Sequence, residues 1–194
     1  MKKSIGSNKL RTAVFISGKG SNFKNLINYS LKKNSIIDIK AVVSSNSKAK
    51  GLNFANKYNI KRKVLSFKNR NKDEINTLKF LNKNKINLIC LAGFMKVLSK
   101  QFINRFRGKI LNIHPSLLPK YKGLNTHERV INNNEKFSGC TVHLVSPKLD
   151  SGKIILQKKV RILKSDNPNK LAKKILKQEH FLYPRAIKKL FINL

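Results

Sequence analysis

Acidic residues are scarce in this chain of 194 residues. Aspartate and glutamate together number 8, against 43 lysines and arginines, so the formal charge at pH 7 is +35. Lysine supplies 35 of these cations and arginine only 8, whereas nucleic-acid recognition depends heavily on the bidentate guanidinium group of arginine. Asparagine (24) and isoleucine (20) are also frequent, and A/T-rich codons encode both of them as well as lysine. The excess charge therefore fits a compositional origin as well as a polyanionic partner.

Long apolar runs are also missing. No run approaches the roughly 18 to 20 residues of a membrane span, and residues 1–11 contain no apolar stretch of the about 7 to 15 residues that a secretory signal needs. We therefore expect a cytoplasmic protein with no membrane partner. The hydrophobic share of 40% suffices for a core, so we expect residues 1–194 to form one domain, with residues 1–10 as a flexible basic extension.

Cysteine is rare as well. Cys90 and Cys140 lie 50 positions apart in apolar, strand-like stretches and lack the close spacing of a zinc or redox pair. Two buried free thiols of a reducing compartment are the expected outcome. With only four histidines besides, no metal-ligand cluster is visible, and we expect no metal.

Short β-rich runs alternate with amphipathic segments through the first half of the chain. We expect strands at 12–16, 37–43, 64–67, 87–91 and 109–113, and helices at 22–33, 49–58 and 73–81. This order predicts an α/β fold with an open, mostly parallel sheet and helices on both faces. Further on, we expect a hairpin-like pair of strands at 140–145 and 153–160 at the far edge of the sheet, then a helix at 170–190 interrupted near Pro184.

The segment SGKGSN (residues 17–22) follows the first strand and leads into a helix. Two glycines allow close approach of the backbone, and the amides at a helix start favour a phosphate. The bulky Phe23 does not fit a dinucleotide fingerprint, and the P-loop spacing is absent. The segment therefore favours a mononucleotide or sugar phosphate, with a plain turn capped by Ser21 or Asn22 as the alternative.

Three further segments carry candidate chemistry. The apolar residues of the segment 91–98 could line a pocket for a flat ring, or the segment could be a short helix that packs in the core. Asn112 and His114 share one face at the end of a strand, which suits a reaction that builds an oxyanion and moves a proton, although a strand-end histidine can be structural. Asp150 lies in a turn, where it could orient and charge His114 or make only local hydrogen bonds.

Five stretches together resemble the folate-dependent glycinamide ribonucleotide formyltransferases of purine synthesis. They are SGKGSN, LAGFMKVLS, LNIHPSLLPKYKG, TVHLVSPKLDSG with the following IILQ, and Gln178-Glu179-His180. The resemblance runs from about residue 11 to about residue 187. It implies the formyltransferase fold, a Rossmann-like twisted sheet with an antiparallel addition on its C-terminal side. It also implies transfer of a formyl group from the co-substrate 10-formyltetrahydrofolate to the amine of glycinamide ribonucleotide, without a metal.

The resemblance assigns residues as well. The catalytic trio falls on Asn112, His114 and Asp150. The ribonucleotide contacts fall on Gly20, Ser21, Asn22 and Glu179, and the folate contacts on Arg70, Met95, Lys96, Val97, Leu98, Asn112, Ser146, Pro147, Lys148, Leu149 and Asp150. His143 also lies where the family has a histidine. Two departures stand out: Lys19 replaces a usual asparagine, and Asn125 replaces a frequent histidine, so we exclude Asn125 from the site.

A mechanism follows as a hypothesis. The substrate amine attacks the formyl carbon, while Asn112 and protonated His114 donate hydrogen bonds to the formyl oxygen. Asp150 favours the charged imidazole and orders a water that relays the proton to the departing folate nitrogen. The partners are then small molecules, with no specific nucleic acid or membrane, and the chain is a monomer or a homodimer.

Three alternatives remain open. A basic nucleic-acid-binding module explains the charge but not the glycine loop, LNIHPSLLP or the turn aspartate. A formyltransferase acting on aminoacyl-tRNA shares the central motif but has an additional C-terminal domain. A formyl-folate hydrolase is a third relative, and it usually carries an N-terminal regulatory domain.

Overall fold

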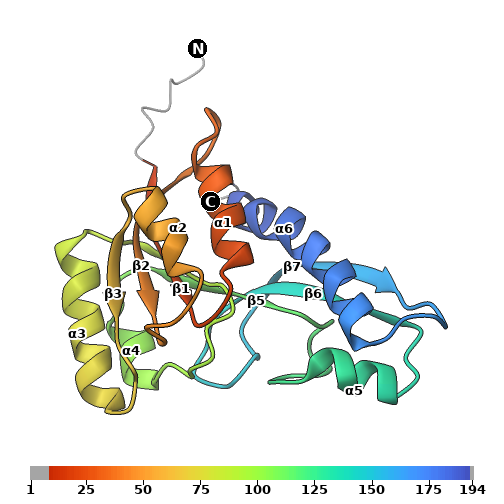
Figure 1. Ribbon diagram of the computed structural model, residues 1–194. Helices are drawn as coiled ribbons and strands as arrows, with labels where there is room; N and C mark the ends of the chain where they lie inside the picture. The colour runs from red at the N-terminus through yellow and green to blue at the C-terminus, as the bar shows by residue number, and fades with distance from the viewer. Residues whose placement is uncertain (1–8, 193–194) are drawn as a thin grey trace.

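The computed structural model describes residues 9–192. Residues 1–8, most of the expected basic extension, and residues 193–194 lie outside the described part. Seven strands form one sheet: β1 (Leu10–Ile16), β2 (Ile37–Ser44), β3 (Lys61–Val64), β4 (Leu88–Leu91), β5 (Lys109–His114), β6 (Phe137–Leu144) and β7 (Ile154–Arg161). Six helices accompany them: α1 (Ser21–Ser30), α2 (Leu52–Lys57), α3 (Arg70–Lys83), α4 (Lys100–Arg105), α5 (Thr126–Asn132) and α6 (Pro168–Ile192) (Figure 1).

The strand order in the sheet is β3-β2-β1-β4-β5-β6-β7. The pairs from β3 to β5 are parallel, because each connection crosses back over the sheet through a helix or loop. The pairs β5–β6 and β6–β7 are antiparallel. The predicted fold class is therefore confirmed, including the antiparallel addition on the C-terminal side.

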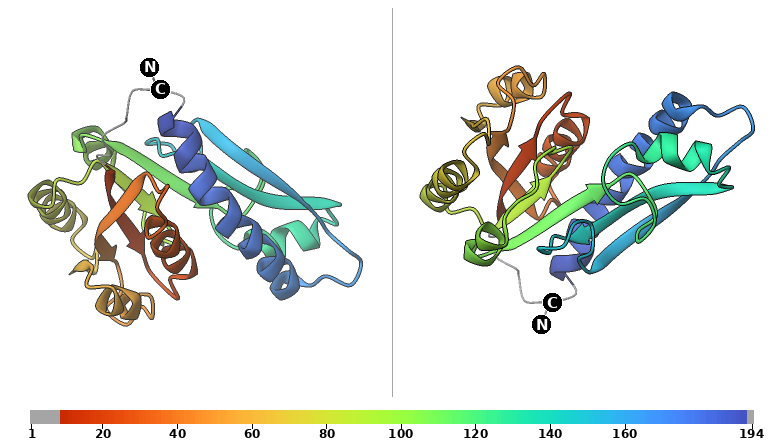
Figure 2. Two further views of the ribbon diagram at one scale, coloured as in Figure 1. Left: turned by 90° about the horizontal axis from the view of Figure 1, so that it is seen from above. Right: turned by 90° about the horizontal axis from the view of Figure 1, so that it is seen from below.

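Buried apolar side chains form one layer on each face of the sheet. The larger layer contains residues of α1, α2, α5 and α6, and the smaller one contains residues of α3 and α4. Figure 2 shows α6 running along β6 and β7, which it contacts. Cys90 and Cys140 are free and buried, as expected. None of the helices in residues 9–192 is long and apolar enough to cross a membrane.

Several element boundaries differ from the expected ones. β1 begins at Leu10, inside the expected extension, because the Leu10 amide donates to the Ile36 carbonyl at 2.8 Å. β3 ends at Val64 rather than at 67, where the positive φ of 56° at Phe67 is incompatible with a strand. The short helices α4 and α5 were not predicted.

The interruption expected near Pro184 is absent, because α6 continues through this residue. An interior proline costs a helix about 3 kcal/mol. Tyr183, Ala186 and Ile187 beside it are fully buried against the sheet. We attribute the continuity of α6 to this packing, which anchors the helix on both sides of the proline.

The carboxyl ends of β1, β4 and β5 lie side by side in the sheet. In open α/β sheets, ligands bind outside the carboxyl ends of the strands. The three segments that follow these strands are residues 17–22, 92–99 and 115–125. These segments overlap with three of the four stretches in which the sequence placed candidate chemistry, although Asn112 and His114 themselves lie on β5.

Candidate active site

A cavity of about 670 Å³ opens beyond the carboxyl ends of β4 and β5. Its lining includes most of the predicted site residues: Asn22, Met95, Lys96, Val97, Leu98, Asn112, His114, Ser146, Pro147, Leu149, Asp150 and Glu179. Four predicted residues, Gly20, Ser21, Arg70 and Lys148, are not part of this lining. The fold thus brings the predicted catalytic trio and residues from both predicted substrate sites around one cavity.

The predicted catalytic trio comes together across two segments. Asn112 and His114 lie two residues apart on β5, and Asp150 lies in the loop between β6 and β7. Nδ1 of His114 is 3.4 Å from Oδ2 of Asp150. Nδ2 of Asn112 is 3.5 Å from Oδ1 of the same carboxylate. One buried carboxylate therefore contacts both polar side chains that line the end of β5.

The other ring nitrogen of His114 defines its tautomer. Nε2 is 2.8 Å from the carbonyl oxygen of Tyr121, which can only accept, so Nε2 carries a proton. Burial lowers the pKa of His114 below its usual value, and this outweighs the raising effects of the Tyr121 carbonyl and of Asp150. Burial therefore disfavours the protonated form of His114, whereas the two acceptors that face its ring nitrogens, the Tyr121 carbonyl and the Asp150 carboxylate, favour it.

Asp150 is surrounded by polar groups. Besides the contacts with His114 and Asn112, the Gly123 amide donates to Oδ2 at 2.9 Å, and Nε2 of His143 lies 3.6 Å from Oδ1. Burial by itself would raise the pKa of Asp150, but the contacts with His143 and Gly123 lower it below its usual value. The carboxylate is therefore ionised at neutral pH, and its Oδ2 faces Nδ1 of His114.

His143 orients the amide of Asn112. The two residues pair across β5 and β6, and Nδ1 of His143 is 2.8 Å from the Leu144 carbonyl, so Nδ1 carries the ring proton. Nε2 then accepts a hydrogen bond of 3.2 Å from Nδ2 of Asn112. This contact fixes which end of the Asn112 amide is the donor, and it turns that donor toward Asp150 and the cavity wall.

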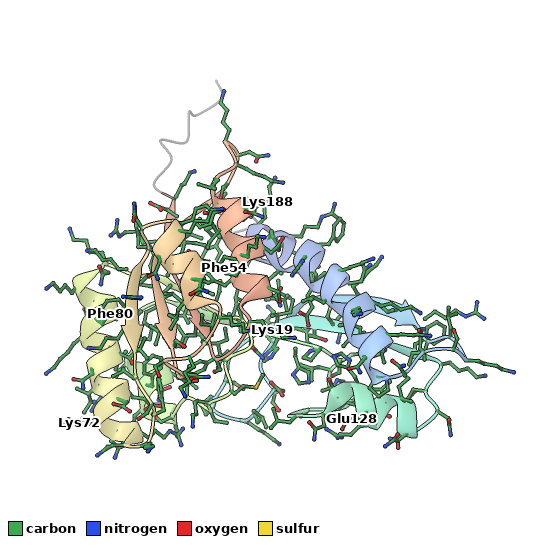
Figure 3. All side chains as sticks on the ribbon, viewed as in Figure 1. Lys19, Phe54, Lys72, Phe80, Glu128 and Lys188 are labelled. Carbon is green, nitrogen blue, oxygen red and sulfur yellow. The ribbon has the colours of Figure 1, made fainter. Side chains whose placement is uncertain are left out.

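The glycine loop after β1 is packed closely against a second glycine. Gly20 has a φ of 73°, and a Cβ at this position would lie 2.6 Å from Cα of Gly51. No side-chain hydrogen bond caps α1 among the described residues, so the helix-capping role considered for Ser21 and Asn22 is not seen. The exposed Lys19 lies beside the start of α1 (Figure 3).

Asn22 and Glu179 connect α1 to α6. Nδ2 of Asn22 donates to Oε2 of Glu179 at 2.7 Å, and both side chains line the cavity. Glu179 is 7% exposed, and burial raises its pKa to about 7, against the lowering effect of Asn22. Burial therefore shifts this carboxyl group toward its protonated form.

The predicted folate residues divide into two groups. Met95 and Val97 are exposed in the cavity wall, whereas Leu98 is buried with Phe102 in the smaller core layer, so the segment both lines a pocket and packs in the core. Arg70 lies at the start of α3, where Nε is 3.3 Å from Oε1 of Glu74. The carbonyl of Lys148 accepts a hydrogen bond from Ser146, which does line the cavity.

Sequence reasoning missed several residues of the site. Tyr121 and Gly123 contribute backbone groups, which no side-chain pattern reveals, although both fall within the quoted motif LNIHPSLLPKYKG. His127 lines the cavity, and burial lowers its pKa. Asn125, which we excluded, also lines the cavity at the start of α5. In residues 9–192, no group of three or more His, Cys, Asp or Glu side chains could hold a metal.

Comparison with known proteins gives consistent matches. The family model described as formyl transferase matches residues 10–187. The phosphoribosylglycinamide formyltransferase of Haemophilus influenzae is 40% identical, over 92% of this chain and 85% of that protein. The trifunctional purine biosynthetic protein adenosine-3 of Gallus gallus is 39% identical over 94% of this chain, which spans only 18% of that relative. The crystal structure of a phosphoribosylglycinamide formyltransferase from Brucella melitensis is 42% identical and superposes with a TM-score of 0.88, covering 94% of this chain and 95% of the other.

Proposed function

The chain belongs to the formyl transferase family, and from this we propose that it is a phosphoribosylglycinamide formyltransferase. It transfers the formyl group of 10-formyltetrahydrofolate to the amine of glycinamide ribonucleotide and releases tetrahydrofolate. The observation that carries the proposal is the placement of Asn112, His114 and Asp150 on one cavity that also reaches Asn22 and Glu179. In that arrangement Asn112 can donate a hydrogen bond to an oxyanion, His114 can accept a proton, and Asp150 supplies a negative charge beside it, all between the two ligand sites.

Asn112 stabilises the developing charge. As the amine nitrogen bonds to the formyl carbon, the formyl oxygen becomes an oxyanion. The Nδ2 proton of Asn112 that is not bound to His143, and that faces Asp150 at 3.5 Å in this structure, turns to donate to the oxyanion. His143 holds that donor in place before the substrate arrives, so little reorganisation is needed. Loss of one such donor typically costs about 10² to 10³ in rate.

His114 moves the proton. Neutral His114 takes up the proton that the attacking amine releases, through Nδ1 or through a water held by Asp150. Both ring nitrogens then donate, one to the Tyr121 carbonyl and the other to the ionised Asp150, which stabilise the imidazolium. His114 returns this proton to the folate nitrogen as the bond between that nitrogen and the formyl carbon breaks. The sum is one bond formed, one broken and one proton transferred.

Residues of the cavity lining, together with nearby residues outside it, suit two anionic substrates. We assign the ribonucleotide phosphate to the amides of Gly20, Ser21 and Asn22 at the start of α1, with Glu179 near the glycinamide group. We assign the folate ring system to residues 95–98 and 146–150. Arg70, Lys96 and Lys148 supply cations for the folate carboxylates. We further propose that the protein acts on these small molecules in the cytoplasm, as a single domain that is monomeric or homodimeric.

An absorbance assay tests the proposal. The conversion of 10-formyl folate to the free folate is followed with and without glycinamide ribonucleotide. Activity that depends on the ribonucleotide supports the transferase. Equal activity without the ribonucleotide would identify a hydrolase instead. If circular dichroism shows a folded protein but neither condition gives activity, both the transferase and the hydrolase would be excluded.

A further inference from the structure

The cavity wall on the folate side has no regular secondary structure. Residues 92–99 connect the end of β4 to the start of α4 without a helix or strand. Met95, Lys96, Val97 and Leu98 of this segment line the cavity. A segment of this kind keeps a fixed shape only if contacts at its ends replace the missing backbone ladder.

Ser17 holds the first end. The Ser17 amide donates to the Gly93 carbonyl at 3.0 Å, and the Met95 amide donates to Oγ of Ser17 at 2.8 Å. Oγ of Ser17 also lies 2.6 Å from Oγ of Ser45. The beginning of the wall is therefore tied to the residue that opens the glycine loop.

Glu74 holds the second end. Its Oε1 accepts a hydrogen bond of 2.7 Å from the Ser99 amide, and its Oε2 accepts a hydrogen bond from Oγ of Ser99. Oγ of Ser99 in turn accepts from the Phe102 amide at 3.0 Å and so caps α4. One carboxylate of α3 therefore fixes the residue at which the wall ends and the next helix begins.

The burial of Glu74 makes this contact consequential. The residue is 4% exposed, and a carboxylate taken out of water is costly unless donors surround it. Ser99 supplies two of these donors, and Nε of Arg70 supplies a third at 3.3 Å. Among only 8 acids in the chain, this one is buried and has no part in the proposed chemistry. Its removal would leave the Ser99 amide without its partner and the end of the wall unanchored.

We propose that Glu74 is a positioning residue for the folate side of the site. Through Ser99 it fixes the end of the wall formed by residues 93–98, and through Nε it holds the side chain of Arg70 beside that end. The inference rests on the proposed function for its choice of ligand. It predicts that Glu74 affects folate binding selectively, because within residues 9–192 no side-chain hydrogen bond joins Glu74 or Ser99 to the catalytic trio or to the glycine loop.

Steady-state kinetics with each substrate varied in turn give the main test. In Glu74→Ala, we expect the KM for 10-formyltetrahydrofolate to rise by about tenfold, as for the loss of a buried charge-assisted hydrogen bond. The KM for glycinamide ribonucleotide and kcat should stay within about twofold. Ser99→Ala keeps the backbone amide and should show a smaller rise. Asp73→Asn, the neighbouring acid of α3, is the matched control and should behave as the unmodified protein.

A readout that does not need turnover separates this inference from the proposed function. Amide hydrogen exchange of residues 93–99 in Glu74→Gln, which preserves the shape of the side chain, should be faster than in the unmodified protein, with exchange in β1 unchanged. If the unmodified protein lacks transferase activity but Glu74→Gln still speeds this exchange, the proposed function fails. The positioning role of Glu74 for residues 93–98 is then still supported. Unchanged exchange of residues 93–99, or an equal rise of both KM values, would overturn the positioning role.

Discussion

The amide of Gly123 donates a hydrogen bond of 2.9 Å to Oδ2 of Asp150, the oxygen that faces His114 at 3.4 Å. Gly123 lies in the loop after β5, and Asp150 lies in the loop between β6 and β7. The backbone of Asp150 has a φ of 46°, in the left-handed region, which costs a residue other than glycine free energy. The backbone amide thus holds the carboxylate in this conformation and lowers its pKa at the same time.

Replacing the Asp150 carboxylate by an amide should separate charge from shape. Asp150→Asn retains one oxygen for the Gly123 amide but no longer stabilises a protonated His114. We expect turnover to fall by about 10² or more, by analogy with the loss of other charged or oxyanion-stabilising groups. The affinities for both substrates and the unfolding midpoint should change little. Unchanged turnover would remove Asp150 from the mechanism.

The contact between His143 and Asn112 gives a second prediction. In His143→Ala, the Asn112 amide loses its fixed acceptor at 3.2 Å and can rotate its oxygen toward the cavity. We expect kcat to fall by about tenfold or more while KM values change little, because the oriented Asn112 donor stabilises the oxyanion of the transition state and not the bound substrates. His180→Ala, on α6 and outside the cavity lining, serves as the control. An equal loss in both variants would contradict the orienting role.

Glu179 makes stability depend on pH. Burial raises its pKa from 4.5 to about 7, so the folded state binds the proton more tightly than the unfolded state does. The stabilisation is therefore complete below about pH 4.5 and is lost as the pH rises through 7. A shift of this size corresponds to about 2 to 3 kcal/mol between pH 5 and 8. As the pH rises from 5 to 8, the unmodified protein should lose this stabilisation while Glu179→Gln does not. The difference in unfolding free energy between the two proteins, measured by urea unfolding, should therefore change by about that amount in favour of Glu179→Gln. A constant difference between the two would show that Glu179 does not titrate there.

Much of the fold could be predicted because its strands are short apolar runs. The predicted bounds of β3 were wrong because its sequence, KRKV, is charged and exposed at the edge of the sheet, where burial imposes no apolar pattern. α4 and α5 were missed because each buries a single apolar residue, Phe102 in α4 and Val130 in α5, so the sequence shows no repeat of apolar positions there. Helical propensity likewise gave no sign that tertiary packing would carry α6 through Pro184.

The candidate site was predictable only in part. Alternation along one strand places Asn112 and His114 on one face, but the approach of Asp150 depends on the register that pairs Asn112 with His143. Glu74 gave no signal, because a glutamate four residues after an arginine is typical of an exposed helix face. The lowered pKa of His114 depends on burial, which the sequence does not reveal.

Two glycines of one loop should respond differently to the same change. A Cβ on Gly20 would lie 2.6 Å from Cα of Gly51, and its φ of 73° disfavours any side chain. Gly18 has nothing within 4 Å of such a Cβ. Gly20→Ala should therefore displace the start of α1 and raise the KM for glycinamide ribonucleotide by about tenfold or more, which corresponds to about 1.4 kcal/mol. Gly18→Ala should stay within about twofold. Similar values in the two variants would contradict the close packing of this loop.

Two tyrosines whose hydroxyl groups are buried should respond differently to removal of those groups. The Tyr183 hydroxyl on α6 donates to the carbonyls of Leu91 and Leu111 at 3.0 and 3.1 Å. It thereby links the end of β4, where the cavity wall of residues 92–99 begins, to the residue of β5 that precedes Asn112. Tyr183→Phe leaves two buried carbonyls without this donor and should cost about 1 to 3 kcal/mol in urea unfolding. The buried Tyr29 hydroxyl has no hydrogen-bond partner within residues 9–192. Tyr29→Phe should therefore be neutral or slightly stabilising, since it removes a polar atom that burial has already separated from water. Equal losses in the two variants would mean that the bond to the strand ends contributes nothing beyond packing.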